Sequence, residues 1–222
     1  MECSSFGIIG KGYVLLASDT TSGNSIVKMK TDEDKTKTLG QHLVMTYSGQ
    51  PGDTVQFAEY VERNLRLHQI RHHHELRPAA AAAWIRRSVA DALRSRSPYA
   101  VNLLVGGFDT SVTAIKEGQE ELGGTPKLYW IDYFGTLADV PFAAHGYGSY
   151  FVFGLLDRYH DPNASLEEGL VTLRRCIDEL SKRLNAAQSN YRVKVVDKDG
   201  LQPSFNPVML ALLHQRPTLQ DD

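Results

Sequence analysis

The feature that most constrains the fold is a pair of short apolar runs at the start of the chain, Phe6 to Ile9 and Tyr13 to Ala17, separated by Gly10-Lys11-Gly12. Glycine readily adopts the positive φ angles of tight hairpin turns, so this pattern predicts a β-hairpin. Asp19 closes the second strand. The hairpin places the first residues at one end of a sheet, where some hydrolases carry a catalytic group.

Further apolar runs bounded by turn residues predict more strands. The run from His42 to Tyr47 stops at Ser48-Gly49-Gln50-Pro51-Gly52, a cluster that typically ends a strand. The polar, glycine-containing stretch 109–125 is expected to be a mobile loop between two strands. The expected strands are 6–9, 13–17, 25–29, 42–47, 101–105, 127–133 and 191–196, with short strand-like pieces before Ala144.

Helices are expected from 53 onward and over 79–95, 147–159 and 165–184. Asp53 with Gln56, and Ser165 with Glu168, fit the capping box, in which an N-cap side chain and a residue three positions later satisfy backbone amides. The alanine run from Ala79 to Ala83 is interpreted as helix propensity and nothing more.

The apolar residues of two helices form stripes. The first helix has two, which are Phe57, Val61 and Leu65, and Tyr60, Leu67 and Ile70. Two stripes are more than one core face needs, so one of them is expected to contact something outside this domain. The fourth helix carries Leu166, Leu170, Leu173, Ile177, Leu180 and Leu184, spaced four and three apart. This stripe predicts a core face; a coiled coil is the alternative, although under three heptads is short for one.

The order of elements is strands, two helices, strands, two helices, strands. It is not the alternation of a parallel fold, and it predicts an α+β architecture with two antiparallel sheets between two helical layers. The 222 residues suit one domain, assigned to residues 1–200. The last stretch, 201–222, has three prolines around the apolar segment 208–213 and is predicted to be a tail that packs as an arm on a neighbouring subunit.

Composition excludes several classes of function. The chain has 24 Lys and Arg against 26 Asp and Glu, a balance that offers no basic footprint for nucleic acid or anionic lipid. The longest apolar run, Ala79 to Ile85, is far shorter than the ~20 residues of a membrane span, and no signal peptide is expected. Cys3 and Cys176 are too few for a disulfide framework. We therefore expect an intracellular protein without nucleic-acid or membrane partners.

Four stretches carry a resemblance to a known family. They are Gly52 to Tyr60 (GDTVQFAEY), Arg94 to Tyr99 (RSRSPY), Pro141 to Gly148 (PFAAHGYG) and Val196 to Gly200 (VDKDG). In this order they resemble the beta subunits of the proteasome, which are members of the N-terminal-nucleophile hydrolase family. The resemblance spans about residues 1–200. It implies a four-layer αββα sandwich, a place in the 20S core particle, and a role in ubiquitin-dependent and other proteasomal protein degradation.

The resemblance also implies which residues of this chain occupy the catalytic positions of the family. In active members an N-terminal threonine attacks the peptide carbonyl, and a lysine, an aspartate and a glycine amide assist it. The resemblance places Asp19 and Lys35 at the assisting aspartate and lysine, Gly49 at the oxyanion glycine, and Cys3 at the threonine. Asp19 and Lys35 are expected either to form a retained structural ion pair or to be solvated separately.

Three departures predict that this chain has no catalytic residues. We expect no propeptide cut at a Gly-Thr junction before Cys3, so Met1 and Glu2 would have to be removed to free its amine. Tyr147 replaces the serine of the family's Gly-Ser-Gly motif, and 184–189 replaces its Asp-Ser-x-Ser-Gly-Gly motif. The chain thus resembles the non-catalytic members. The alternatives are an active peptidase that uses Cys3 after trimming and a free-standing small-molecule amidase of the same fold.

The remaining motifs receive structural interpretations, and no cofactor or metal site is expected. Adjacent histidines such as His72-His73-His74 point in different directions, so a solvated loop is favoured over a metal site. Cys176 is expected to be a small buried hydrophobic residue. The aromatic residues Tyr147, Tyr150, Phe151 and Phe153 are expected in the core or at a subunit contact.

The expected partners follow from the resemblance alone. They are other beta subunits in the same and the opposite ring, and subunits of the alpha rings. The expected location is the cytoplasm and nucleus.

Overall fold

The computed structural model describes residues 4–24, 27–110, 124–184 and 190–203. Its strands are β1 Ser5–Gly10, β2 Tyr13–Asp19, β3 Ser22–Asn24, β4 Val27–Lys30, β5 Thr36–Gly40, β6 Leu43–Gly49, β7 Val101–Asp109, β8 Thr125–Ile131, β9 Leu137–Asp139, β10 Phe142–His145, β11 Tyr191–Asp197 and β12 Gly200–Leu201. Its helices are α1 Asp53–His72, α2 Pro78–Leu93, α3 Ser149–Tyr159 and α4 Leu166–Arg183.

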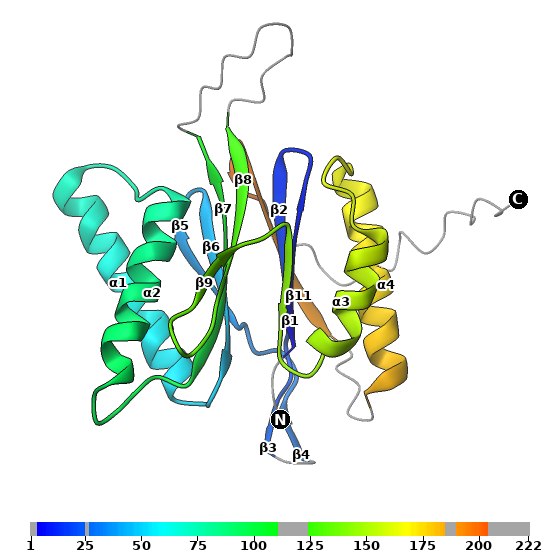
Figure 1. Ribbon diagram of the computed structural model, residues 1–222, viewed down its shortest axis with the longest axis horizontal. Coiled ribbons are helices and arrows are strands. Elements are labelled where there is room, and N and C mark those ends of the chain that lie inside the picture. Colours follow the sequence, from blue (N-terminus) through cyan, green and yellow to red (C-terminus); the bar gives the residue numbers. More distant parts are fainter. Residues whose placement is uncertain (1–3, 25–26, 111–123, 185–189, 204–222) are drawn as a thin grey trace, which may run out of the picture.

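The molecule has four layers, with two sheets packed face to face and a helix pair on each outer face (Figure 1). The first sheet has the order β10-β1-β2-β11-β12 and is covered by α3 and α4; the second has the order β5-β6-β7-β8-β9 and is covered by α1 and α2. The paired strands run antiparallel. The αββα sandwich of two antiparallel sheets is confirmed.

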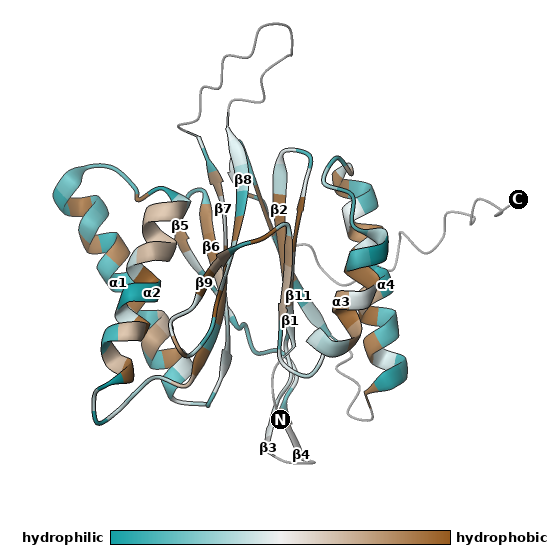
Figure 2. Ribbon diagram, viewed as in Figure 1, coloured by the Kyte–Doolittle hydropathy of each residue, from teal (hydrophilic) through white to brown (hydrophobic). Residues whose placement is uncertain are grey.

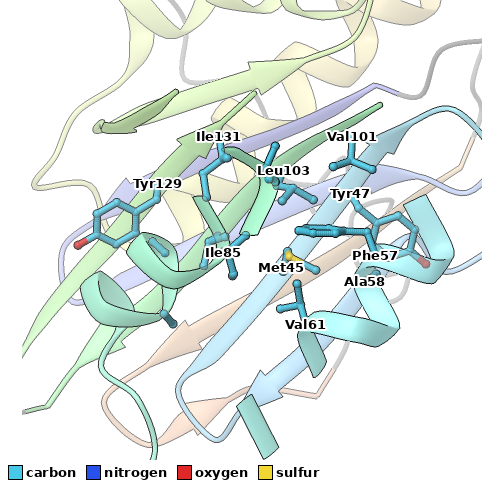
Figure 3. Packing of buried hydrophobic residues seen from close by; sticks show 14 of the residues in the cluster. Met45, Tyr47, Phe57, Ala58, Val61, Ile85, Val101, Leu103, Tyr129 and Ile131 are labelled. Carbon is cyan, nitrogen blue, oxygen red and sulfur yellow. The ribbon is translucent and has the colours of Figure 1, made fainter. Parts of the chain in front are cut away.

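The hydrophobic core forms three layers because strand side chains alternate between the two faces of each sheet. On β2, Leu15 and Ala17 point to α3 and α4, whereas Val14 and Leu16 point to the other sheet. Both faces are buried, which explains the uninterrupted apolar run. Figure 2 shows the hydrophobic residues concentrated on the two sheets and hydrophilic residues along the outer helices. Figure 3 shows the core layer between the second sheet and its helices, where side chains of β6, β7 and β8 meet those of α1 and α2.

Tyr13 connects the hairpin to α4. Its hydroxyl donates to the backbone oxygen of Ser165 at 3.0 Å, and burial raises the pKa of this phenol to about 12. Gly10 and Gly169 lie against the ring from opposite elements, and a Cβ at either position would overlap it. The ring therefore fills a space that only two glycines leave open.

Several predictions about local structure are confirmed. β1 and β2 pair from Ser5–Ser18 to Gly10–Tyr13 as the predicted hairpin. The capping box of α4 is complete, because Ser165 Oγ accepts from Glu168 N and Glu168 Oε2 accepts from Ser165 N. The leucine stripe of α4 packs on the first sheet, so the core face is confirmed over the coiled coil.

Other predictions are wrong. Asp53 is not an N-cap: Gly52, at φ 99°, takes that position, and Asp53 Oδ2 accepts from Ala100 N at 3.2 Å. Ala81 and Ala82 are fully buried, so the alanine run is packing surface as well as helix propensity. Strand β5 was not predicted.

Three predictions concern segments that lie wholly or largely outside the described residues. They are the mobile loop at 109–125, the segment 184–189 that replaces the family's Asp-Ser-x-Ser-Gly-Gly motif, and the arm at 208–213. At the start of the predicted tail, Leu201 still pairs with Val196 in the first sheet.

Candidate functional site

A buried ion pair lies at the end of β2. Lys35 Nζ is 3.0 Å from Asp19 Oδ1 and donates a second hydrogen bond of 2.6 Å to the backbone oxygen of Thr21. The Asp19 side chain is 1% exposed and that of Lys35 is 11% exposed. Of the two alternatives from sequence, the ion pair is confirmed and separate solvation is wrong.

The start of the chain lies beside this pair. Asp19 N donates to Ser4 O at 3.0 Å, which fixes the backbone immediately after Cys3. Cys3 itself lies outside the described residues. A Cβ on Gly148 would lie 2.8 Å from Ser4 Oγ, so the Gly146-Tyr147-Gly148 turn approaches the same point. The structure thus brings together residues 4–19 and 146–148, two segments that the family resemblance assigns to the same active site.

Gly49 occupies the last position of β6. Its φ of 136° is outside the range that L side chains normally adopt, and a Cβ there would collide with the Ala100 carbonyl oxygen. The collision follows from local pairing, because Gln50 N donates to the same oxygen at 3.0 Å. Both conformation and space therefore require glycine at this position.

A polar cleft of about 90 Å³ joins two of the predicted residues. Lys35 and Gly49 both line it. Its remaining lining residues are Thr21, Ser22, Gly23, Glu33, Tyr47, Ser48, Pro51, Gly52, Thr54 and Val55. The cleft carries an ammonium group, a carboxylate and several hydroxyls, so it can accept a small polar or extended peptide group.

Four hydroxyls are buried, three of them near the beginning of β1 and the end of β2, and the sequence interpretation missed them. Ser4, Ser5, Ser18 and Thr46 each have an Oγ shielded from solvent and without a hydrogen-bond partner in the described part of the chain. Ser5 and Ser18 are directly paired residues of β1 and β2. The signal was present in the hairpin register, which places both serines on one face. Ser4, Ser5 and Ser18 make this end of the first sheet polar, whereas Thr46 lies in the middle of β6.

A buried histidine lies at the same end of the first sheet. His145 pairs with Ser5, stacks on Trp130 with ring centroids 4.9 Å apart, and donates from Nε2 to Leu103 O at 3.1 Å. Burial lowers the pKa of His145 to about 4, although hydrogen bonds to backbone oxygens oppose this change. The imidazole is therefore neutral near pH 7 and joins the two sheets as a hydrogen-bond donor.

Other candidate groups have simpler surroundings. Cys176 is fully buried, and burial raises the pKa of its thiol to about 12, so it is a structural residue. In the described residues no group of three or more His, Cys, Asp or Glu side chains is placed, as it stands, to hold a metal ion. None of the described helices is both long and apolar enough to span a bilayer.

The aromatic residues of the 147–159 segment are exposed. Tyr147, Tyr150, Phe151 and Phe153 are 57%, 81%, 37% and 41% exposed. Of the two places expected for them, the core is therefore wrong for this chain taken alone. A subunit contact remains a prediction.

Comparisons with known proteins agree with this geometry. The chain matches the family described as "Proteasome subunit" over residues 3–196. It is 41% identical over 196 residues to proteasome subunit beta type-4 of Saccharomyces cerevisiae, an alignment that covers 88% of this chain and 93% of the yeast protein. It is 43% identical over 200 residues to proteasome subunit beta type-2-B of Arabidopsis thaliana, with 90% and 94% covered, and 41% identical over 200 residues to proteasome subunit beta type-2 of Oryza sativa, with 90% and 88% covered.

Proposed function

This chain belongs to the proteasome subunit family and is a beta subunit of the 20S core particle, and on that premise we propose that it is a non-catalytic subunit at the fourth beta position. Its work there is to help assemble the ring and form the wall of the chamber in which proteins are degraded. One observation carries this proposal. The residues that would assist a nucleophile are present and two of them form an ion pair, but residue 3, where active members have the threonine nucleophile, is a cysteine.

These assisting residues are Asp19, Lys35 and Gly49. A hydrolase of this class needs a nucleophile with a free amine as its base, and a hydroxyl that assists this amine. Tyr147 stands where the family has the assisting serine, and its side chain is 57% exposed. The nearby Ser149 Oγ donates to Gly146 O at 2.7 Å, so its proton is directed to the local turn. The buried Asp19–Lys35 pair then serves to hold the chain start in the sandwich.

The alternative is an active peptidase that uses Cys3 after trimming. Purified core particles treated with an electrophilic peptide probe distinguish the two, because the catalytic subunits of the same particle provide an internal positive control. We expect those subunits to be labelled and this chain to stay unlabelled. Labelling of this chain that is abolished by Cys3→Ala, together with an N-terminal sequence beginning at Cys3, would overturn the proposal.

The partners proposed are beta subunits of the same and the opposite ring and subunits of the alpha rings. Support comes from the second stripe of α1: Tyr60, Leu67 and Ile70 are 44%, 40% and 63% exposed, although the first stripe is buried in the core. We also propose that segment 208–213 packs on a neighbouring subunit. Truncation after Gln202 is then expected to reduce incorporation into particles, and unchanged incorporation would refute this role.

We also propose the cytoplasm and nucleus as the locations of the assembled subunit. The support is the family resemblance. Fractionation of cells that carry a tagged chromosomal copy, with a second core-particle subunit as the reference, tests it. The two proteins are expected to show the same distribution between fractions.

A further inference from the structure

Four histidines lie close together where α1 ends. His68 and His72 are one helical turn apart on the same face, and their ring centroids are 4.4 Å apart. His73 follows the helix at φ 60°, a left-handed conformation, and its N–H donates to Gln69 O at 2.8 Å. This reversal returns His74 to the same face, with ring centroids 5.3 Å from His68 and 6.1 Å from His72.

This arrangement changes the interpretation of the histidine run. Of the three adjacent histidines only His73 diverges, and it takes part in none of the ring contacts among the described residues. The expectation that all three point in different directions is wrong for His72 and His74, whose ring centroids are 6.1 Å apart. The helix adds His68, which lies four residues before His72 and therefore one turn away on the same face. A pair of histidines at i and i+4 on a helix is a recurrent metal-chelating geometry, and His74 supplies a third imidazole.

The hydrogen bonds leave a free ligand atom on two of the rings. His74 Nδ1 lies 3.1 Å from Glu75 O, and because a carbonyl oxygen only accepts, Nδ1 carries the proton and Nε2 keeps its lone pair. His68 is hydrogen-bonded to the backbone of His74, whereas its Nδ1 is shielded from solvent and has no partner among the described residues. Metal-binding histidines commonly have one nitrogen bonded to a backbone oxygen while the other holds the ion.

We propose that His68, His72 and His74 form a surface binding site for a divalent transition-metal ion that prefers imidazole, such as Ni²⁺, Cu²⁺ or Zn²⁺. The rings do not yet surround a common point, so binding requires them to rotate. His72 and His74 are exposed, and rotation of an exposed side chain between rotamers costs little. The helix and the left-handed turn fix the backbone positions of the three histidines. Water molecules supply the remaining ligands of the ion.

The neighbouring carboxylate is not part of this site. Both oxygens of Glu75 accept from Gln41 N, at 2.9 and 3.0 Å, and Oε1 also accepts from Gln69 Nε2 at 3.2 Å. Glu75 therefore fastens the α1–α2 connection to the β5–β6 turn. The site has three nitrogen ligands and no protein charge, a set that favours borderline ions over Mg²⁺ or Ca²⁺.

The test is a calorimetric titration of the untagged full chain with Ni²⁺ and, separately, with Zn²⁺. We expect one ion per chain. His72→Gln and His74→Gln should each weaken binding at least about tenfold, whereas His73→Asn, which retains the left-handed turn, should leave the Kd unchanged. His68→Gln should also weaken binding, and equal melting temperatures would show that the fold is intact.

A second measurement counts the ligands directly. The spectrum of bound Cu²⁺ by electron paramagnetic resonance should show coupling to three imidazole nitrogens, and to only two in His72→Gln at an ion concentration that saturates the variant. The proposal is overturned if no ion binds, if His73→Asn weakens binding as much as His72→Gln, or if the ion stays bound with the same Kd in His72→Gln and His74→Gln.

Discussion

Lys35 Nζ and Asp19 Oδ1 lie 3.0 Å apart in a place almost closed to solvent. Burying two charges is costly, and the cost is offset only while both are present. The pair therefore constrains the chain start more strongly than a surface ion pair would.

We predict that Lys35→Met destabilises the protein by about 3–5 kcal/mol, because it leaves the Asp19 carboxylate buried without its ammonium partner. Urea unfolding followed by circular dichroism measures this. The surface pair Lys30–Asp32, whose side chains are 57% and 80% exposed, is the matched control: Lys30→Met should change the unfolding free energy by less than about 1 kcal/mol. The double variant Asp19→Asn/Lys35→Met should lose less than the sum of the two single changes. Additive losses would contradict coupling between the two residues.

Gly49→Ala is predicted to destabilise the protein by more than about 1 kcal/mol, because φ is 136° and the added Cβ meets the Ala100 carbonyl. Gly154→Ala is the control, since Gly154 is exposed within α3 and a Cβ there has nothing within 4 Å. The control should be neutral or stabilising by up to about 1 kcal/mol, because alanine favours helix over glycine. Equal midpoints in urea for the two variants would contradict the constraint at Gly49.

Stability is predicted to fall as the pH drops from about 6.5 to 4. The pKa of His145 is about 4 in the folded chain and near 6.5 when unfolded, so in this range the unfolded state binds more protons. The contribution of this residue is constant above pH 6.5, and about 3 kcal/mol is lost once the pH is below 4. Unfolding free energies at pH 7.5 and 5.0 should differ more in the wild type than in His145→Gln. If the imidazole of His145, assigned by the loss of its signal from the NMR spectrum of His145→Gln, titrates near pH 6.5 in the folded wild type, the prediction is refuted.

Replacement of Leu67 by lysine is predicted to block incorporation into the core particle while the isolated chain stays folded. The side chain is 40% exposed, so the core loses little, but a charge on an apolar contact surface carries an uncompensated desolvation cost. Native gels of cell lysates measure incorporation. Leu67→Met keeps the apolar surface and should assemble normally. Full incorporation of Leu67→Lys would show that this stripe of α1 is not a contact.

The elements that could be predicted from sequence are those whose signal is local. The hairpin at Gly10-Lys11-Gly12 and the capping box at Ser165 depend on a few adjacent residues, and both are correct. Strand β5 could not be found, because of its five residues Thr36–Gly40 only Thr36 is buried, and no apolar alternation marks it. Its strand conformation comes from pairing with β6.

The site was predictable only in part, for the same reason. The resemblance pointed to Asp19 and Lys35 as members of one site, but whether their side chains meet depends on how the connection after β4 returns to β2. The role of Ala100 at Gly49 arises from tertiary structure, because the two residues lie far apart along the chain.

His68 and His72 have the i, i+4 spacing of one helix face, so that part of the histidine cluster was present in the sequence. The return of His74 depends instead on the left-handed turn at His73.

Tyr13 has a consequence for how sequences of this kind can diverge. Its ring occupies the room left by Gly10 and Gly169, and its hydroxyl holds the first residue of the α4 cap. Neither glycine can acquire a side chain while the tyrosine remains, and a smaller residue in place of the tyrosine leaves a void that a methyl group at either glycine could begin to fill. The three positions are therefore expected to change together in related chains, as one evolutionary unit assembled from two strands and a helix.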